Sequence, residues 1–233
     1  MKKKVLNYII LSVAFCVILF FAICICMGKS FYLDQFMKKL IVDGLRRDWL
    51  TEIVKVLTNL GSLPAYIVYL AIAFFVVKNK RVVYSMVVNL GIAACLMLII
   101  KNIVRRPRPF DLMLIEETGF SFPSGHSLNA FVFFGFIIYL VYKFNKDKKK
   151  KEHLWLPIVC GLLMLLIPLS RIYLGVHYAS DCLCGMLVGY ISLYVFVNYI
   201  EYSKPLDYCW NIIEGIFGSK KKNGKEKSKW STL

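Results

Sequence analysis

The chain has 233 residues, of which 58% are hydrophobic and only 19% are charged, and its mean hydropathy is +0.61. Because soluble domains carry nearer a quarter of charged residues, this composition excludes an ordinary soluble globular domain. The formal net charge of +16 would usually suggest a nucleic-acid partner, but the basic residues lie mostly between long apolar blocks. Membrane topology explains the charge better, so we expect no nucleic-acid partner.

The apolar blocks predict an all-α, polytopic membrane protein built as a bundle of six transmembrane helices. The candidate spans are Val5–Met27, Leu63–Val77, Val82–Val104, Ser127–Tyr142, Leu154–Leu169 and Cys182–Ile200. The second, fourth and fifth are short for a hydrocarbon core of about 30 Å, so flanking residues or local thinning must cover the mismatch. No repeat and no soluble domain of useful size remain, so residues 1–233 are expected to form a single membrane domain.

The first apolar block is too long for the apolar region of a signal peptide, and no small-x-small cleavage site follows it. We therefore expect an uncleaved first span. Most of the 30 lysines and arginines lie at the N-terminus, at the turn 78–81, in the loop 143–151 and in a basic tail at about 204–233. The positive-inside rule then predicts cytoplasmic N- and C-termini, and the tail could also contact anionic lipid headgroups of the cell membrane.

The segment Ser30–Leu60 follows the first span and differs from the spans. Apolar residues recur there at helical spacing while charges fill the other face, which predicts amphipathic helices. These helices either lie on the outer membrane surface or form a soluble hairpin over the bundle. Gly61-Ser62-Leu63-Pro64 then breaks the pattern and begins the second span.

Three polar clusters fall in the segments that this topology places on the extracytoplasmic face. They are Lys101 with Arg108, Ser124-Gly125-His126, and Arg171 with His177 and Asp181. Basic side chains at span ends commonly reach for lipid headgroups, but that explanation fits poorly on the side from which the positive-inside rule keeps such residues. Arginine presents a planar fork suited to phosphate and lysine a point charge, so the three cations predict an anion site.

His177 and Asp181 are four residues apart, so on a helix they would share a face. A carboxylate there can accept a hydrogen bond from one ring nitrogen and leave the other with a free lone pair. Such a nitrogen is a nucleophile or a base that a third group orients. An ordinary ion pair at a span end explains the spacing equally well when the pair is taken alone.

Ser124-Gly125-His126 follows Pro123 and precedes the fourth span. Ser124 can cap that helix, Gly125 permits close backbone approach, and free N–H groups at a helix start bind anions. Plain helix capping is the simpler interpretation of the serine and the glycine. It does not account for a histidine placed just inside an anion site.

The neighbouring polar residues give weaker signals. Pro107 and Pro109 should end the third helix, while Arg105 and Arg106 have no assigned role. Glu116-Glu117 is predicted to be a solvated loop pair. No paired carboxylates, His-x-x-Glu-His motif or clustered cysteines suggest a metal, so we expect none, and the eight cysteines fit as apolar packing residues.

Three cations, a helix start and two histidines on one membrane face are the parts that a phosphoryl-transfer site requires. At this point the sequence resembles the type 2 phosphatidic acid phosphatase superfamily, whose members are membrane lipid phosphatases. Its three-part signature is matched in residue type, spacing and order by Lys101-x6-Arg108-Pro109, Pro123-Ser124-Gly125-His126 and Ser170-Arg171-x5-His177-x3-Asp181. The motif region spans residues 101–181, and the six-span layout extends the resemblance over most of the chain.

The resemblance implies a metal-independent phosphatase that works in two steps. His177 would attack phosphorus and form a phosphohistidine, with Asp181 orienting its ring. His126 would protonate the leaving lipid oxygen and then activate water. The phosphate oxygens would be held by Lys101, Arg108 and Arg171, assisted by Ser124 and the backbone of Gly125.

The expected function is therefore hydrolysis of the terminal phosphate of a membrane lipid. Phosphatidylglycerophosphate, phosphatidate and a polyprenyl diphosphate such as undecaprenyl diphosphate all remain open, and the resemblance favours the first. A lipid phosphotransferase would use the same phosphohistidine with another acceptor. A non-catalytic lipid-binding or channel-like protein would use the basic residues as an anion site, but it would not need a histidine at position 177.

Overall fold

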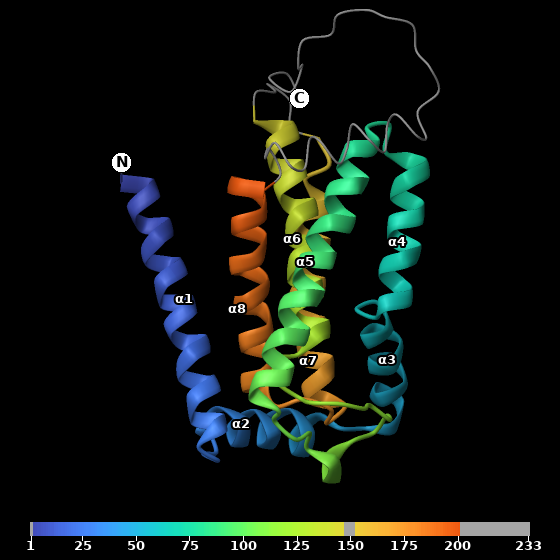
Figure 1. The fold of residues 1–233 in the computed structure, drawn as a ribbon. Coiled ribbons are helices and arrows are strands. Elements are labelled where there is room, and N and C mark those ends of the chain that lie inside the picture. Colours follow the sequence, from blue (N-terminus) through green and yellow to red (C-terminus); the bar gives the residue numbers. More distant parts are fainter. Residues whose placement is uncertain (1, 147–151, 201–233) are drawn as a thin grey trace, which may run out of the picture.

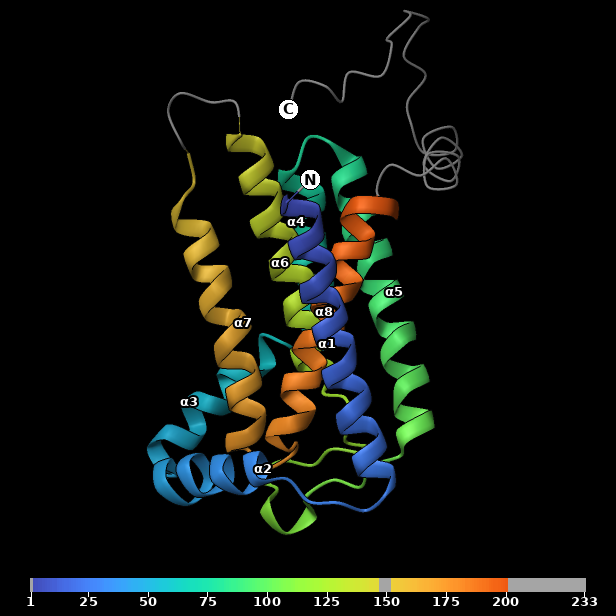
Figure 2. The same ribbon diagram turned by 90° about the vertical axis from the view of Figure 1, so that its left-hand side faces the viewer.

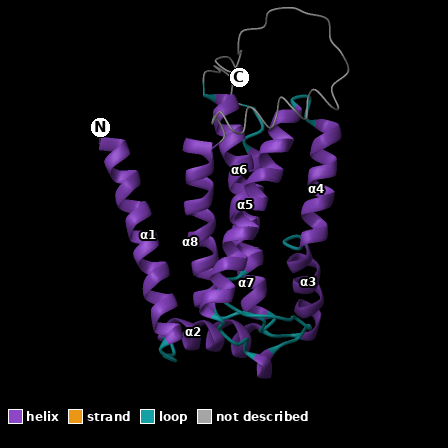
Figure 3. Ribbon diagram, in the orientation of Figure 1, coloured by secondary structure: helices purple, strands orange, loops and turns teal. Residues whose placement is uncertain are grey.

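The computed structural model describes residues 2–146 and 152–200. The basic tail predicted at about 204–233 and part of the lysine-rich loop therefore lie outside the described residues. Within the described residues the regular elements are all helices, joined by loops (Figure 3). The predicted all-α membrane fold is confirmed.

Long helices run side by side as a bundle (Figure 1). They are α1 (Lys2–Cys26), α4 (Leu63–Val76), α5 (Lys80–Val104), α6 (Gly125–Asn145), α7 (Trp155–Tyr173) and α8 (Ala179–Val195), the last continuing into the π-helical turn η3 (Phe196–Ile200). Among the described residues, five helices are long and apolar enough to cross a membrane. A sixth span results if α4 is counted together with α3 (Asp48–Asn59), to which it is joined at a bend of 53°.

Two helices are longer than the apolar blocks that predict them. Helices α6 and α7 contain 21 and 19 residues, which removes most of the predicted mismatch with the bilayer. The added turns are polar: α6 begins at Gly125-His126, and α7 continues through Arg171 to Tyr173. Hydropathy places the end of a span at its first polar residue, but the backbone of these two helices remains helical beyond that residue.

The amphipathic segment after the first span divides into two parts. The short helix α2 (Tyr32–Met37) and the π-helical η1 (Lys38–Asp43) lie across one end of the bundle (Figures 1 and 2). Helix α3 instead turns along the bundle, packs against α7 and leads into α4. Arg46 fixes the turn between them, because it donates hydrogen bonds to the carbonyl oxygens of Tyr173 (2.8 Å) and Leu112 (2.7 Å).

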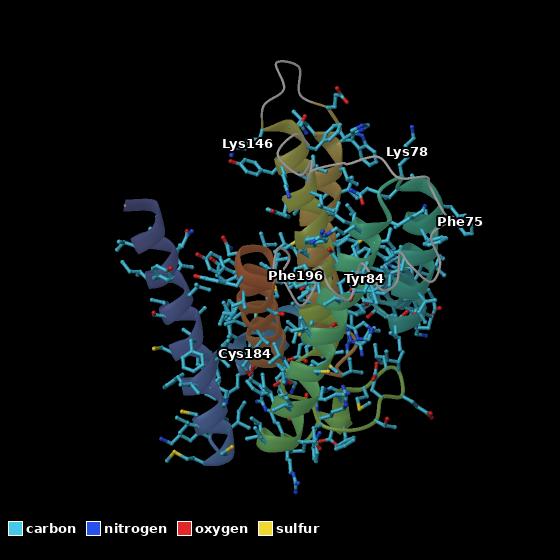
Figure 4. All side chains as sticks on the ribbon, turned by 45° about the horizontal axis from the view of Figure 1, so that its top comes forward. Phe75, Lys78, Tyr84, Lys146, Cys184 and Phe196 are labelled. Atoms are coloured by element: carbon cyan, nitrogen blue, oxygen red, sulfur yellow. The ribbon has the colours of Figure 1, made fainter. Side chains whose placement is uncertain are left out.

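Helix α6 lies at the centre and packs against α5, α7 and α8. Phe196 of η3, which is labelled in Figure 4, is buried against Phe136 of α6, and the ring centroids are 5.7 Å apart. Phe75 lies on the outside of α4 in the same view, with 83% of its surface exposed. Buried aromatic rings inside and exposed apolar rings outside are the expected arrangement for helices that face lipid.

Two glycines bring α8 against the start of α6. A Cβ atom added at Gly185 would lie 2.6 Å from the Ser124 carbonyl oxygen, and one at Gly189 would lie 2.9 Å from that of Leu128. Contacts this close are possible only without a side chain. The approach also lets the Ser124 N–H donate to the Asp181 carbonyl oxygen at 3.0 Å, so the first turns of the two helices meet.

Candidate active site

The residues predicted to form the site meet at one end of the bundle, where α2 crosses it (Figures 1 and 2). Lys101 and Arg171 lie in the last turns of α5 and α7, and His126 and Asp181 lie in the first turns of α6 and α8. Loops that join these helix ends carry Arg108, Ser124 and His177. Segments up to 80 residues apart in sequence therefore contribute to one place because the antiparallel helices end there.

His177 does not share a helix with Asp181, so the helical argument for their pairing was wrong. Helix α8 begins at Ala179, with Tyr178 as its N-cap, and His177 lies in the loop before it. The two side chains are nevertheless close, with 3.7 Å between His177 Nδ1 and Asp181 Oδ2. That distance is too long for a hydrogen bond, so the predicted direct bond is absent.

The His177 ring is buried, and each of its nitrogens faces a different partner. Nδ1 lies 3.2 Å from Ser121 Oγ, and Nε2 lies 3.2 Å from Arg108 Nη1. A guanidinium can only donate, so Nε2 accepts this bond with the lone pair of the neutral ring. Burial lowers the pKa of His177 to about 4, against opposition from the nearby Asp181, so the ring is neutral near pH 7.

Asp181 is completely buried, and its carboxylate accepts three hydrogen bonds. Its Oδ2 accepts from Ser121 Oγ (2.5 Å) and from the Tyr178 N–H (2.9 Å), and its Oδ1 accepts from Arg106 Nη1 (2.6 Å). The bond from Tyr178 also caps α8. A carboxylate removed from water needs this degree of compensation to remain charged.

Arg106, which has no role in the sequence-based prediction, is the counter-ion of this carboxylate. Its second terminal nitrogen donates to Asp34 Oδ2 of α2 at 2.8 Å, and Nη1 also donates to Ser180 Oγ at 2.7 Å. Its guanidinium stacks 3.8 Å from the centroid of the Tyr178 ring. Burial opposes the charge on Arg106, but the two carboxylates outweigh it and raise its pKa above the ordinary value.

Arg108 and Lys101 hold the loop that precedes α6. Arg108 donates to the carbonyl oxygens of Val176 (2.9 Å), Thr118 (2.9 Å) and Gly119 (3.1 Å), and Lys101 Nζ donates to that of Phe120 at 2.5 Å. Burial lowers the pKa of Arg108, although the guanidinium stays charged. Both cations thus fix the backbone between two of the signature motifs.

Arg171 is 1% exposed and only partly satisfied. Its Nη1 donates to Thr58 Oγ1 of α3 at 2.9 Å, and its Nη2 contacts the Glu117 carboxylate. In the described part of the chain its buried Nε has no hydrogen-bonding partner. A buried donor without an acceptor is costly, and an anionic ligand would supply the acceptor.

Glu117 corrects the prediction of a solvated loop pair. Its side chain is 27% exposed, and its carboxylate contacts Arg171 Nη2 and lies 3.6 Å from Arg108 Nη2. A carboxylate between two arginines occupies the position that the sequence predicts for a phosphate. The glutamate was missed because neither its spacing from Arg171 nor its local sequence carries a signal.

Helix α6 begins as predicted, with Ser124 as its N-cap. The Ser124 Oγ accepts from the Ser127 N–H at 3.4 Å. A Cβ at Gly125 would lie 2.5 Å from Met97 Sδ, so the glycine lets α6 approach α5. These contacts show helix capping and close packing, and a role of either residue in binding phosphate remains a prediction.

The His126 ring lies in the same cluster of charges. Arg171, His177, Arg108 and Lys101 are all within electrostatic range of it. A Cβ at Gly61 would lie 3.2 Å from His126 Cδ2, which places the ring beside the start of α4. Among the described residues the His126 ring makes no hydrogen bond, unlike the ring of His177.

Residues 82–205, which contain the three signature motifs, match the family model described as the PAP2 superfamily. The chain belongs to the PAP2 superfamily. Among curated relatives, phosphatidylglycerophosphatase B of Bacillus subtilis (strain 168) is 32% identical over 164 residues, which cover 67% of this chain and 78% of the relative. Undecaprenyl-diphosphatase of Sulfolobus acidocaldarius is 27% identical over 139 residues, which cover 57% of this chain and 62% of the relative.

A solved structure supports the same assignment. The crystal structure of a transmembrane PAP2-type phosphatidylglycerolphosphate phosphatase from Bacillus subtilis has a TM-score of 0.66 to this chain at 28% identity. The likeness covers 80% of this chain and 96% of that one. The protein is thus a PAP2 membrane lipid phosphatase, a hydrolase that acts on phosphate esters, and it is similar to phosphatidylglycerophosphatase B.

Proposed function

We propose that the protein removes the terminal phosphate from a membrane lipid through a phosphohistidine formed on His177. The observation that carries this proposal is the neutral His177 ring, whose Nε2 lone pair lies 3.2 Å from Arg108 within the same cluster as Arg171. A neutral nitrogen beside buried guanidinium groups combines a nucleophile with an anion site. The unpaired Nε of Arg171 supports the same interpretation, because a phosphate oxygen would satisfy it.

The proposed reaction has two displacements. Nε2 of His177 forms a bond to phosphorus while the bond from phosphorus to the lipid oxygen breaks, and His126, which enters the step as the imidazolium, gives that oxygen its proton and becomes neutral. Water then attacks the phosphohistidine, His126 takes the proton of the water, and phosphate leaves with Nε2 restored. A lipid alkoxide is a poor leaving group, so the proton donor is expected to contribute roughly 10²–10⁴-fold to the rate.

The other signature residues are proposed to bind the phosphate. Arg171 and Arg108 would exchange the Glu117 carboxylate for phosphate oxygens, and Lys101 would add a point charge. Ser124 and the Gly125 backbone would assist from the start of α6, where free N–H groups favour anions. The Asp181 carboxylate, held by Arg106, would stabilise the positive charge that develops on the His177 ring.

A cavity lies beside His177 on its Arg106 side, and because Arg108 and Arg171 do not line it, we propose that it takes the apolar part of a lipid and not the phosphate. It has a volume of about 330 Å³ and lies between the end of α1, α2, η1 and the loop before α6. Apolar side chains such as Ile25, Val42 and Ile172 contribute to its lining, and so do Lys29 and Lys38. A cavity lined by apolar and basic residues suits the junction between the acyl chains and the polar part of a phospholipid.

We infer from the distribution of lysine and arginine that this end of the bundle faces the extracytoplasmic side, with the termini in the cytoplasm. Phosphatidylglycerophosphate is the favoured substrate because of the similarity to phosphatidylglycerophosphatase B. Phosphatidate and undecaprenyl diphosphate remain alternatives, the latter because of the similarity to undecaprenyl-diphosphatase. Each carries a terminal phosphate on an apolar anchor, which is what the signature residues would recognise.

The test is phosphate release by the purified protein from a panel of these three lipids, with EDTA present and His177→Ala as the control. We expect release in EDTA from at least one lipid and none by the variant. Adding alcohol acceptors separates a phosphotransferase, which would form a new phosphate ester at the expense of free phosphate. Equal lipid binding by the unchanged protein and by His177→Ala, without phosphate release by either, would indicate a non-catalytic lipid-binding protein. Activity that is lost in EDTA and restored by a divalent ion would contradict metal independence.

A further inference from the structure

Ser121 lies between the proposed nucleophile and its carboxylate, outside the three signature motifs. Its hydroxyl oxygen is 3.2 Å from His177 Nδ1 and 2.5 Å from Asp181 Oδ2. The direct distance between Nδ1 and Oδ2 is 3.7 Å. The imidazole and the carboxylate are therefore connected through the serine rather than to each other.

The positions of the hydrogens follow from the chemistry of the partners. Arg108 can only donate, so His177 Nε2 accepts and the single proton of the neutral ring is on Nδ1. The ionised carboxylate of Asp181 can only accept, so the Ser121 hydroxyl donates its one hydrogen to Oδ2. The serine oxygen is left to accept from the Nδ1–H, which gives a chain of two hydrogen bonds that run in the same direction.

The serine is fixed in place independently of these bonds. Its N–H donates to the Arg106 carbonyl oxygen at 2.8 Å, and both Ser121 and the following Phe122 are completely buried. Arg106 in turn holds Oδ1 of Asp181. The backbone of the Arg106 segment thus locates the serine while its side chain locates the carboxylate, so the two ends of the chain of bonds are set together.

We propose that Ser121 is a positioning residue of the phosphatase reaction, which holds the Nδ1–H tautomer of His177 and links the ring to the charge of Asp181. The inference rests on the function proposed above. When Nε2 bonds to phosphorus, the ring becomes positively charged, and the Nδ1–H donates more strongly to the serine oxygen. The serine passes this polarisation to Asp181 without any proton leaving the ring, and groups of this kind around a reacting imidazole are worth about 10–100-fold by analogy with partners of metal-bound histidines.

The matched pair of variants is Ser121→Ala and Ser192→Ala. Both remove a buried hydroxyl, but the Ser192 oxygen in α8 has no partner in the part of the chain described here. With the preferred lipid of the panel, Ser121→Ala should lower kcat by roughly 30-fold and change KM by less than about threefold, because the hydroxyl acts on the ring and not on the phosphate. Ser192→Ala should change neither constant.

A second comparison distinguishes the linking role from a purely structural one. Asp181→Asn removes the far end of the chain of bonds, so Ser121→Ala added to it should slow kcat by no more than about threefold further. Full additivity of the two losses, or a kcat for Ser121→Ala within about threefold of the unchanged protein, would overturn the proposal. His177→Ala serves as the reference: its activity would refute the phosphohistidine function itself, whereas an inactive His177→Ala beside a fully active Ser121→Ala refutes only the role of the serine.

Discussion

The two sides of the His177 ring differ in how completely their polar groups are paired. On the Asp181 side, the carboxylate accepts bonds from Arg106, Ser121 and the Tyr178 backbone, and Arg106 is shared with Asp34. On the Arg171 side, the buried Nε has no partner among the described residues, and the opposing carboxylate of Glu117 is 27% exposed. One side is complete within the protein, and the other is not.

This difference indicates what each side is for. Fully satisfied buried networks hold side chains in one geometry, which is what a nucleophile needs. A buried donor without a partner destabilises the ligand-free protein, and a ligand that accepts its hydrogen bond removes that cost. The Asp181 side is therefore expected to position His177, and the Arg171 side is expected to bind the phosphate, with Glu117 as its counter-ion when no substrate is bound.

The largest expected effect is that of His177→Ala, since this residue is the proposed nucleophile. The variant should release phosphate at least about 10⁴-fold more slowly, as expected when a nucleophile is removed from a unit that acts together. Phosphate release in detergent measures the loss, and thermal unfolding shows that the protein still folds. Turnover within a factor of ten of the unchanged protein would remove the covalent mechanism.

Arg106→Met tests whether the Asp181 side depends on its counter-ion. Because it leaves two carboxylates without their shared cation, one of them completely buried, it should destabilise the protein by about 3–5 kcal/mol and abolish most activity. Arg105→Met is the matched control, since Arg105 is the exposed neighbour that donates to the Asn102 carbonyl oxygen. Thermal unfolding measures the stability of both variants, and equal melting temperatures would contradict this account.

His126→Gln tests the proposed proton donor on the Arg171 side. With a lipid substrate the rate should fall by roughly 10²–10⁴-fold, because the alkoxide then leaves without a proton. With an aryl phosphate such as p-nitrophenyl phosphate the loss should be much smaller, because that leaving group is stable without protonation. Equal losses on the two substrates would show that His126 does not act as the acid.

The dependence of stability on pH tests the burial of His177. Its pKa of about 4 lies below the value of about 6.5 in an unfolded chain, so the unfolded state binds the proton more readily. The free energy of unfolding is therefore unaffected by His177 above pH 6.5. As the pH falls from 6.5 toward 4, protonation of the unfolded state lowers it by up to about 3 kcal/mol. The free energy of unfolding should fall more steeply with decreasing pH in the unchanged protein than in His177→Gln over this range. The same pH dependence in both proteins would contradict the buried neutral ring.

The smallest expected effect is that of Glu117→Gln. Removing the carboxylate that pairs with Arg171 should lower KM by a few fold, because the phosphate no longer competes with an internal anion. Glu116→Gln is the matched control, and it should leave KM unchanged. Steady-state kinetics with one lipid phosphate measure both, and an increased KM for Glu117→Gln would show that the glutamate supports binding.

The sequence predicted the membrane fold and the end of the bundle at which the signature residues meet, because long apolar blocks and motif spacing are local signals. It did not predict the partners of those residues. Asp34 and Arg106 are separated by 72 residues, and Ser121 and Asp181 by 60, and no pattern in the chain links either pair. These contacts exist only because helix ends distant in sequence meet in the fold.

One local argument also failed, and the reason is physical. The spacing of His177 and Asp181 suggested a shared helix face, but Tyr178 is the N-cap of α8. Its N–H donates a hydrogen bond to the Asp181 side chain. A carboxylate three residues after the cap favours a helix start there, which leaves His177 in the loop. The predicted proximity was right, although the hydrogen bond runs through a serine that the spacing could not reveal.

The most direct test of the central claim is to trap the intermediate during turnover. Protein mixed with ³²P-labelled lipid phosphate and quenched in alkali should carry label on His177, as a phosphohistidine that is stable to alkali and labile to acid. The structure predicts that Nε2 bears the phosphoryl group, since Nδ1 faces Ser121, and chromatography of the alkaline digest separates the two isomers. Label on Nδ1, on another residue or on the His177→Ala variant would contradict the account.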